Sequence, residues 1–254
     1  MIDIHSHILA GFDDGASSLE ESIEMCRIAK ADGIETIVAT PHILKGNYRN
    51  EDPQLILEKI EELKAKSPDG IEILPGSDVH FQHDIIHRLI DQRSIISINN
   101  KCYLLIEFPF NLIPVGTKEV FRQLLSNGYK PIITHPERNM EFIQSPKLLF
   151  ELIQEGALAQ ITAMSIIGEF GSITKKASHH FLKHNLVHVI ASDAHDASWR
   201  TPTLKEAVTA AAEIIGPEKA KAMVEDNPRS ILKGEELSFF EEPIFPKLIN
   251  YTFI

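Results

Sequence analysis

The chain has 254 residues, 43% of them hydrophobic, and a formal net charge of −11 at pH 7. Such a length can bury one large core, and one α/β barrel domain fits it as well as two small domains do. The acidic balance excludes a general nucleic-acid-binding surface, which requires clustered lysine and arginine. The opening segment MIDIHSH is charged rather than apolar, and no later run approaches the roughly 18 apolar residues of a membrane span. We therefore expect a cytoplasmic protein without stable membrane insertion.

Short β-rich runs alternate with helical stretches along the chain. There are seven such runs, at Ile2–His5, Glu35–Ala39, Ile71–Leu74, Tyr103–Ile106, Pro131–Thr134, Leu158–Thr162 and Val187–Ala191. The alternation predicts βα units with a parallel sheet, and near-continuous apolar strands such as YLLI and PIIT are typical of a sheet covered on both faces. The pattern itself leaves a barrel and a doubly wound sheet open. We expect a single domain over residues 1–233.

The first helix and the C-terminal segment carry distinct local signals. Ser17 and Glu20 have capping-box spacing, which predicts that a helix begins there, and Gly33 predicts its end. Residues 234–254 form a tail that is rich in aromatic side chains, namely Phe239, Phe240, Phe245, Tyr251 and Phe253. We expect the tail to pack on the domain's own surface rather than on a partner, because large exposed apolar patches are uncommon on monomers.

Histidines and carboxylates stand where nearly every expected strand ends. In chain order they are His5 and His7, Asp14 in the FDDG loop, His42, Asp78, Glu107, His135, Asp193 and His195. The carboxyl ends of parallel strands meet at the active site of barrels and open α/β sheets, so we expect these side chains to converge. The spacing of H-x-H and D-x-H places both side chains on one face of an extended strand.

This residue set favours metal binding. Imidazole and carboxylate ligands without thiolate are typical of Zn, Mn or Fe rather than of a structural cysteine site. A single H-x-H motif is weak evidence, and polar residues are common where loops begin. The combination is stronger, because so many partly buried and unpaired histidines would be costly. We expect His83, His87, His179, His180 and His184 to be solvated instead, on polar helices.

The segments IDIHSH, DDG, TPH, PGSD, LIEF, THPER and SDAH occur in this order. Together they resemble the PHP (polymerase and histidinol phosphatase) superfamily, and more narrowly its bacterial tyrosine-protein phosphatases associated with capsular and exopolysaccharide tyrosine kinases. The resemblance covers residues 1–233. It implies a distorted seven-stranded (β/α)7 barrel, similar to a TIM barrel, and three divalent metal ions. Manganese is the ion most expected, with iron or zinc as alternatives.

The resemblance also implies how the ligands are shared. One ion would take His5, His7 and Asp193, a second Glu107 and His135, and a third Asp14, His42 and His195. Asp78 would bridge the first two ions, at a position where the family normally has the longer glutamate. Arg138 and Arg200 match positions that the family uses near the phosphate, and a guanidinium fork suits two phosphate oxygens.

The activity that the resemblance implies is hydrolysis of phosphotyrosine in proteins, such as a tyrosine kinase that regulates capsule or exopolysaccharide biosynthesis. Hydroxide activated by the metal ions would attack phosphorus in line. Neither Cys26 nor Cys102 has an arginine six residues later, which excludes the usual thiol route, and we expect both to be core thiols. A small-molecule phosphatase such as histidinol phosphatase, or a noncatalytic metal-binding scaffold that docks on a kinase, remains an alternative. The chain is compatible with a monomer or a homo-oligomer.

Overall fold

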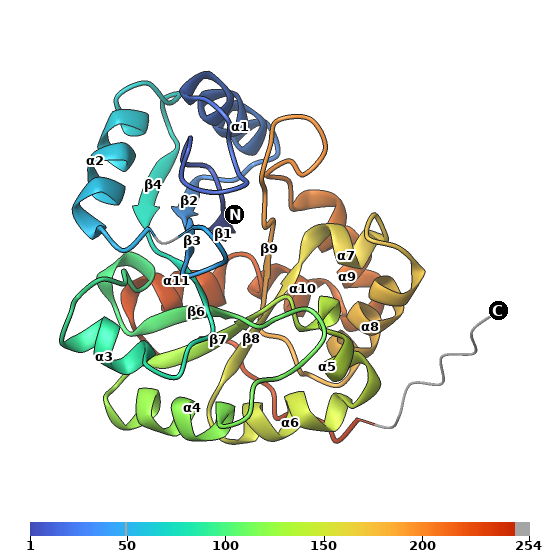
Figure 1. The fold of residues 1–254 in the computed structure, drawn as a ribbon. Helices are drawn as coiled ribbons and strands as arrows, with labels where there is room; N and C mark the ends of the chain where they lie inside the picture. Colours follow the sequence, from blue (N-terminus) through green and yellow to red (C-terminus); the bar gives the residue numbers. More distant parts are fainter. Residues whose placement is uncertain (49, 247–254) are drawn as a thin grey trace.

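The computed structural model describes residues 1–48 and 50–246 (Figure 1). The strands in this part of the chain are β1 (Ile2–Ser6), β2 (Thr36–Ala39), β3 (His42–Ile43), β4 (Glu72–Pro75), β5 (Asp78–His80), β6 (Tyr103–Glu107), β7 (Lys130–Thr134), β8 (Leu158–Thr162) and β9 (Val189–Ala191). All pairs between these strands are parallel. The structure therefore confirms a parallel α/β fold.

Along the chain, most helices follow a strand, and in space they lie around the outside of the strands (Figure 1). They are α1 (Leu19–Ala31), α2 (Pro53–Lys64), α3 (Ile85–Ile90), α4 (Thr117–Ser126), α5 (Met140–Gln144), α6 (Pro146–Gln154), α7 (Ala163–Ile167), α8 (Ser172–Lys183), α9 (Lys205–Ile215), α10 (Pro217–Ala222) and α11 (Asp226–Lys233). Two short 3₁₀ turns, η1 (Ile98–Asn100) and η2 (Pro136–Arg138), complete the elements described.

The strands form two sheets rather than the single closed seven-stranded barrel that the family resemblance implies. One sheet has the order β1-β2-β4 and the other the order β3-β5-β6-β7-β8-β9. Each of the seven expected runs contains a strand, but β3 and β5, which were not expected, continue the second and third runs after a break. Pro41 and Pro75 stand at these breaks. Proline has no N–H to donate to a neighbouring strand, which accounts for the interruption.

The two sheets meet where the end of β1 approaches the segment after β9. His7 N donates to Ala194 O at 2.8 Å, and Asp193 N donates to His5 O at 2.9 Å. Ser6 and Ala194 form an isolated parallel bridge there. These backbone bonds place three expected metal ligands at the junction between the sheets.

Apolar side chains fill the space on both sides of the strands. The larger cluster lies between the strands and the outer helices and includes Ile37, Leu104 and Ile133. A smaller one includes Ile4 and Leu105 from the opposite strand faces, together with Ile231 of α11. The buried histidines and carboxylates that follow the strands lie apart from these two apolar clusters. They form a polar region at the carboxyl ends of the strands.

Helix α1 begins one residue later than the sequence predicts. Its N-cap is Ser18, whose side chain accepts a hydrogen bond from Glu21 N at 3.2 Å. The Glu21 carboxylate accepts in turn from Ser17 N at 2.8 Å. The predicted capping box of Ser17 and Glu20 is therefore wrong. The next serine, Ser18, has the same spacing to Glu21, and this pair forms instead. The helix ends at Ala31, just before Gly33 with φ +88°.

The described part of the tail, residues 234–246, runs over the surface of the domain. Tyr103 Oη donates to Glu235 O at 2.6 Å, and Phe239 N donates to Asn227 Oδ1 at 3.0 Å. The Phe240 ring stacks on His188, with ring centroids 5.5 Å apart. Phe240 and Phe245 are nevertheless about half exposed, at 48% and 58%. The other two aromatic residues of the tail, Tyr251 and Phe253, lie outside the described residues.

Among the described helices, none combines the length and the apolar character that a bilayer crossing requires.

The cap of α1 can be tested by Ser18→Ala. Loss of the Ser18 hydrogen bond should lower the free energy of unfolding by about 1 kcal/mol, measured by denaturant titration. Ser126→Ala, at an exposed position near the end of α4, is the control and should stay within about 0.5 kcal/mol of the unaltered protein. If Ser17→Ala lowered the free energy of unfolding more than Ser18→Ala, the result would support Ser17 as the N-cap, as the sequence predicts.

Candidate metal centre

The structure brings the nine expected metal ligands together where β1, β6, β7 and β9 end and where β3 and β5 begin. His5 lies in β1, His42 begins β3, Asp78 begins β5 and Glu107 ends β6. The other five lie in the segments that follow strands, and every member of the set except Asp14 is buried. Three groups of closely spaced ligand atoms can be distinguished among the described residues.

The first group joins the two sheets. His5 Nε2 and His7 Nε2 are 3.1 Å apart. Asp193 Oδ1 lies 3.5 Å from the His5 nitrogen and 3.4 Å from the His7 nitrogen. The group has the same three members that the family resemblance implies for one ion.

The second group consists of His42, Asp78 and Glu107. His42 Nδ1 lies 3.0 Å from Asp78 Oδ2 and 3.6 Å from Glu107 Oε2. The same Asp78 oxygen is 3.6 Å from His5 Nε2, so it lies between the first and second groups. The aspartate side chain thus reaches both groups, although it is one methylene shorter than the glutamate that the resemblance implies at this position.

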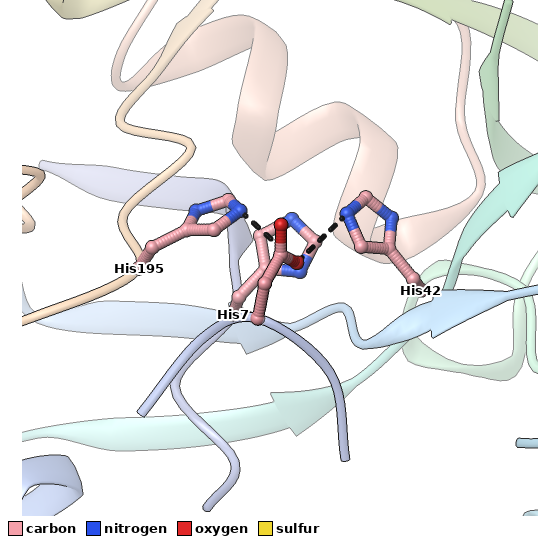
Figure 2. Close-up of side chains that lie close together, drawn as sticks. His7, His42 and His195 are labelled. Atoms are coloured by element: carbon pink, nitrogen blue, oxygen red, sulfur yellow. Dashed lines mark ion pairs between the residues drawn. The ribbon is translucent and has the colours of Figure 1, made fainter. Parts of the chain in front are cut away.

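The third group surrounds Asp14 in the loop after β1. Asp14 Oδ1 lies 3.4 Å from His42 Nε2 and 3.6 Å from His195 Nε2. Figure 2 shows the rings of His7, His42 and His195 around one centre, with dashed lines for these two ion pairs. His7 belongs to this group as well as to the first, which the resemblance did not imply.

His135 belongs to none of the three groups found in the described residues. Its Nε2 lies 3.6 Å from Glu107 Oε1, but Lys45 Nζ donates to that same oxygen at 2.8 Å. Lys45 Nζ is also 2.9 Å from His42 Nε2. A lysine ammonium therefore occupies the space between these ligands, and the sequence alone did not indicate it.

The residues present fit divalent metal ions. Both carboxylate oxygens of Asp78, Glu107 Oε2 and His42 Nδ1 are buried and have no hydrogen-bond partner within the described structure. His42 Nδ1 lies 3.0 Å from Asp78 Oδ2, but buried carboxylates without hydrogen-bond donors are costly, and a cation that these atoms coordinate would lower that cost. The donor atoms are nitrogen and oxygen without sulfur, a set that suits Mn, Fe or Zn.

The ionisation of the ligands follows from their mutual contacts. Burial alone would lower the pKa of His5, but Asp78 and Asp193 raise it to about 9. Burial likewise opposes the protonated form of His42, yet Asp14 and Asp78 raise its pKa to about 10. Since an imidazole nitrogen must be free of its proton to bind a metal ion, ion binding to His5 and His42 releases protons and is favoured at higher pH.

Arg138 and Arg200 lie beside the first group of ligands. Arg138 Nη1 and Arg200 Nη2 contact Asp193 Oδ2 at 2.6 and 2.7 Å. Asp193 and His135 both have left-handed backbone, with φ of 53° and 33°. Such strain in residues other than glycine is typical of functional sites.

Two further polar residues orient the ligands and were missed in the sequence. Asp13 Oδ2 is 2.7 Å from His7 Nδ1 and accepts a hydrogen bond from His42 N at 2.8 Å. Gln160 Oε1 lies 3.0 Å from His5 Nδ1. A carboxylate or amide on the second ring nitrogen holds the imidazole in position. The signals were available, because Asp13 is the first aspartate of DDG and Gln160 is a polar residue in the middle of the apolar strand β8.

An α/β fold of parallel strands with imidazoles and carboxylates clustered at the strand ends is typical of metal-dependent hydrolases of the PHP superfamily. The model of the capsular polysaccharide synthesis family CpsB/CapC matches residues 1–233, and the chain belongs to this family. The tyrosine-protein phosphatase YwqE of Bacillus subtilis is 38% identical over 97% of this chain and 96% of its own length. The tyrosine-protein phosphatase CpsB of Streptococcus pneumoniae is 32% identical over 92% of this chain and 99% of its own length.

A solved structure is similar throughout. The crystal structures of YwqE from Bacillus subtilis and CpsB from Streptococcus pneumoniae are described as unique metal-dependent tyrosine phosphatases. The matching chain has a TM-score of 0.92 and 38% identity, covering 97% of this chain and 100% of that one.

The glycine of the DDG loop can be tested by Gly15→Ala. A Cβ at this position would lie 2.1 Å from His7 O and 2.6 Å from His7 Cβ, so the loop that holds Asp13 and Asp14 must move. We expect affinity for Mn²⁺ to fall at least about tenfold in titration calorimetry. Gly128→Asn is the control, because nothing lies within 4 Å of its Cβ and asparagine tolerates left-handed backbone. Unchanged Mn²⁺ binding by a folded Gly15→Ala protein would contradict this account of the loop.

Proposed function

We propose that this protein is a metal-dependent phosphatase that hydrolyses phosphotyrosine in proteins. The observation that carries the proposal is the position of Arg138 and Arg200, whose guanidinium groups share Asp193 with the imidazoles of His5 and His7. Phosphate-binding groups thereby adjoin a cluster suited to divalent ions. The names of the relatives, which are tyrosine-protein phosphatases, support the choice of substrate.

The proposed site binds three divalent ions, with manganese most expected and iron or zinc as alternatives. The proposed ligands are His5, His7, Asp14, His42, Asp78, Glu107, His135, Asp193 and His195. Bound divalent ions supply positive charge for the phosphate oxygens and lower the pKa of water. The net charge of −11 is therefore compatible with an anionic substrate.

The chain's own residues bind and orient the substrate. Arg138 and Arg200 are held by Asp193 with donors available for phosphate oxygens, and a guanidinium keeps its charge at all physiological pH values. Asp13 and Gln160 hold the rings of His7 and His5 in place. The phenolate that leaves from phosphotyrosine has a conjugate-acid pKa of about 10, so it needs less help from a general acid than an alkoxide does.

The proposed protein substrate is a bacterial tyrosine kinase of capsule or exopolysaccharide synthesis. The description of the matching family as one of capsular polysaccharide synthesis supports this choice. We place the reaction in the cytoplasm, since Cys26 and Cys102 are both free thiols, as a reducing compartment favours.

The proposal is tested by measuring hydrolysis of a phosphotyrosine peptide before and after chelation. Elemental analysis gives the metal content of the protein in each case. Turnover should be lost on chelation and return with Mn²⁺. Asp193→Asn should lower kcat/KM at least about a hundredfold, because one carboxylate charge then no longer faces both imidazoles and guanidiniums. Exposed Asp69→Asn is the matched control and should leave kcat/KM unchanged. Preferred turnover of histidinol phosphate would favour a small-molecule phosphatase, and bound metal without any hydrolysis would favour a scaffold.

The cysteines provide a second test of the metal-dependent route. Cys26 is buried in α1, and burial raises the pKa of its thiol to about 12, which disfavours the nucleophilic thiolate. Cys102 is half-buried rather than a core residue, and its thiol lies 3.5 Å from Gly234 O. Cys26→Ala and Cys102→Ala should keep kcat/KM for the peptide within about twofold. A large loss in either variant, with folding intact by circular dichroism, would point to thiol chemistry.

A further inference from the structure

Aromatic side chains from three separate loops surround the two arginines. Phe110 follows β6, Phe170 follows α7, and Trp199 lies in the loop after β9. Phe110 is 46% exposed and Trp199 is 58% exposed, whereas Phe170 is half-buried. None of the three is needed to hold an ion, and large exposed apolar groups beside a polar site are typical of ligand recognition.

The Arg138 guanidinium is flanked by two of these rings. Its Cζ lies 5.2 Å from the Phe110 ring centroid and 4.8 Å from the Phe170 ring centroid. Arg200 Cζ lies 5.8 Å from the Phe170 centroid, and the Trp199 ring meets Phe170 edge to face at 6.0 Å. Both phenylalanine rings therefore lie next to the groups that would bind the phosphate.

The loop that carries Phe110 is held firmly by hydrogen bonds. Met140 N donates to Phe110 O at 2.7 Å, and Asn139 Nδ2 donates to Pro109 O at 2.7 Å. The Phe110 ring also stacks on His135, with centroids 6.3 Å apart and planes 24° apart. An aromatic side chain on a fixed backbone loses little conformational entropy when it binds a ligand, which makes it an effective recognition group.

We propose that Phe110 and Phe170 form an aryl slot, which receives the phenyl ring of phosphotyrosine and makes the site selective for aryl over alkyl phosphoesters. The inference rests on the proposed function. When phosphate lies against Arg138 and Arg200, the ester group is the next part of the substrate, and the two phenylalanine rings border the same guanidinium. A phenyl ring gains edge or stacking contacts with them, whereas the methylene of phosphoserine offers only a small apolar surface.

The two rings could instead act only by holding Arg138 in place through cation–π contacts. In that case they would be positioning residues, and their loss would weaken binding of every phosphoester alike. The aryl slot predicts a different result, because substrates without a ring make no contact that the substitution removes. The two roles therefore separate in a comparison of matched substrates.

The experiment compares two peptides of the same sequence that carry phosphotyrosine or phosphoserine. Phe110→Leu and Phe170→Leu should each lower kcat/KM for the phosphotyrosine peptide roughly three- to tenfold and leave the phosphoserine value nearly unchanged. Phe170→Tyr keeps the ring and should retain the preference. The control is Phe245→Leu in the tail, an exposed phenylalanine that contacts Phe150 of α6 and should alter neither value. Equal losses for both peptides would overturn the aryl slot.

A binding measurement separates this inference from the proposed function. In calorimetry with the Mn²⁺-loaded protein, Phe110→Leu and Phe170→Leu should lower the affinity for phenylphosphonate roughly three- to tenfold and leave the affinity for inorganic phosphate unchanged. This comparison needs no turnover, so it tests the aryl slot whatever the enzyme hydrolyses. Failure of the unaltered protein to hydrolyse the phosphotyrosine peptide contradicts the proposed function, whereas unchanged phenylphosphonate binding in both variants contradicts the aryl slot.

Discussion

The carboxylate of Asp193 faces two kinds of cationic group at once, and the rest of the site is arranged around it. Oδ1 lies 3.5 and 3.4 Å from the nitrogens of His5 and His7, while Oδ2 contacts Arg138 and Arg200 at 2.6 and 2.7 Å. The side chain is buried, and the imidazoles and guanidiniums together compensate its charge in a region of low dielectric constant. The ligand cluster and the arginines therefore fix each other's positions.

Local charge rather than net charge determines what this site can bind. The protein carries a formal charge of −11, yet two guanidiniums and the Lys45 ammonium lie within the cluster of ligands. The carboxylates hold the pKa of His5 and His42 well above the ordinary value, to about 9 and 10. With divalent ions bound among these ligands, an acidic protein can present positive charge to phosphate, and the phenylalanine rings beside Arg138 add an apolar border to the site.

The convergence of the ligands could be predicted from the sequence. The carboxyl ends of parallel strands lie at one edge of the sheet, whether the sheet is open or closed. That rule was enough to bring His7, Glu107 and Asp193 together without knowledge of the fold's details. The breaks after β2 and β4 were not predicted, since a proline near a strand end does not reveal whether pairing resumes beyond it. The contact of Lys45 with Glu107 depends on a loop conformation that no spacing in the sequence encodes.

The junction between the two sheets has a thermodynamic consequence. His5 belongs to the three-stranded sheet, and Asp193 follows the last strand of the six-stranded sheet, so the first ligand group spans the isolated bridge between Ser6 and Ala194. A cation coordinated there would hold together two parts that are also joined at this point by backbone bonds and by hydrogen bonds from Ser192 to Asp3. Ligand binding to the native state alone raises resistance to unfolding. Occupancy of the site by the cation and the unfolding temperature of the protein should therefore rise together. A cell that is short of the cation would lose folded protein as well as catalysis.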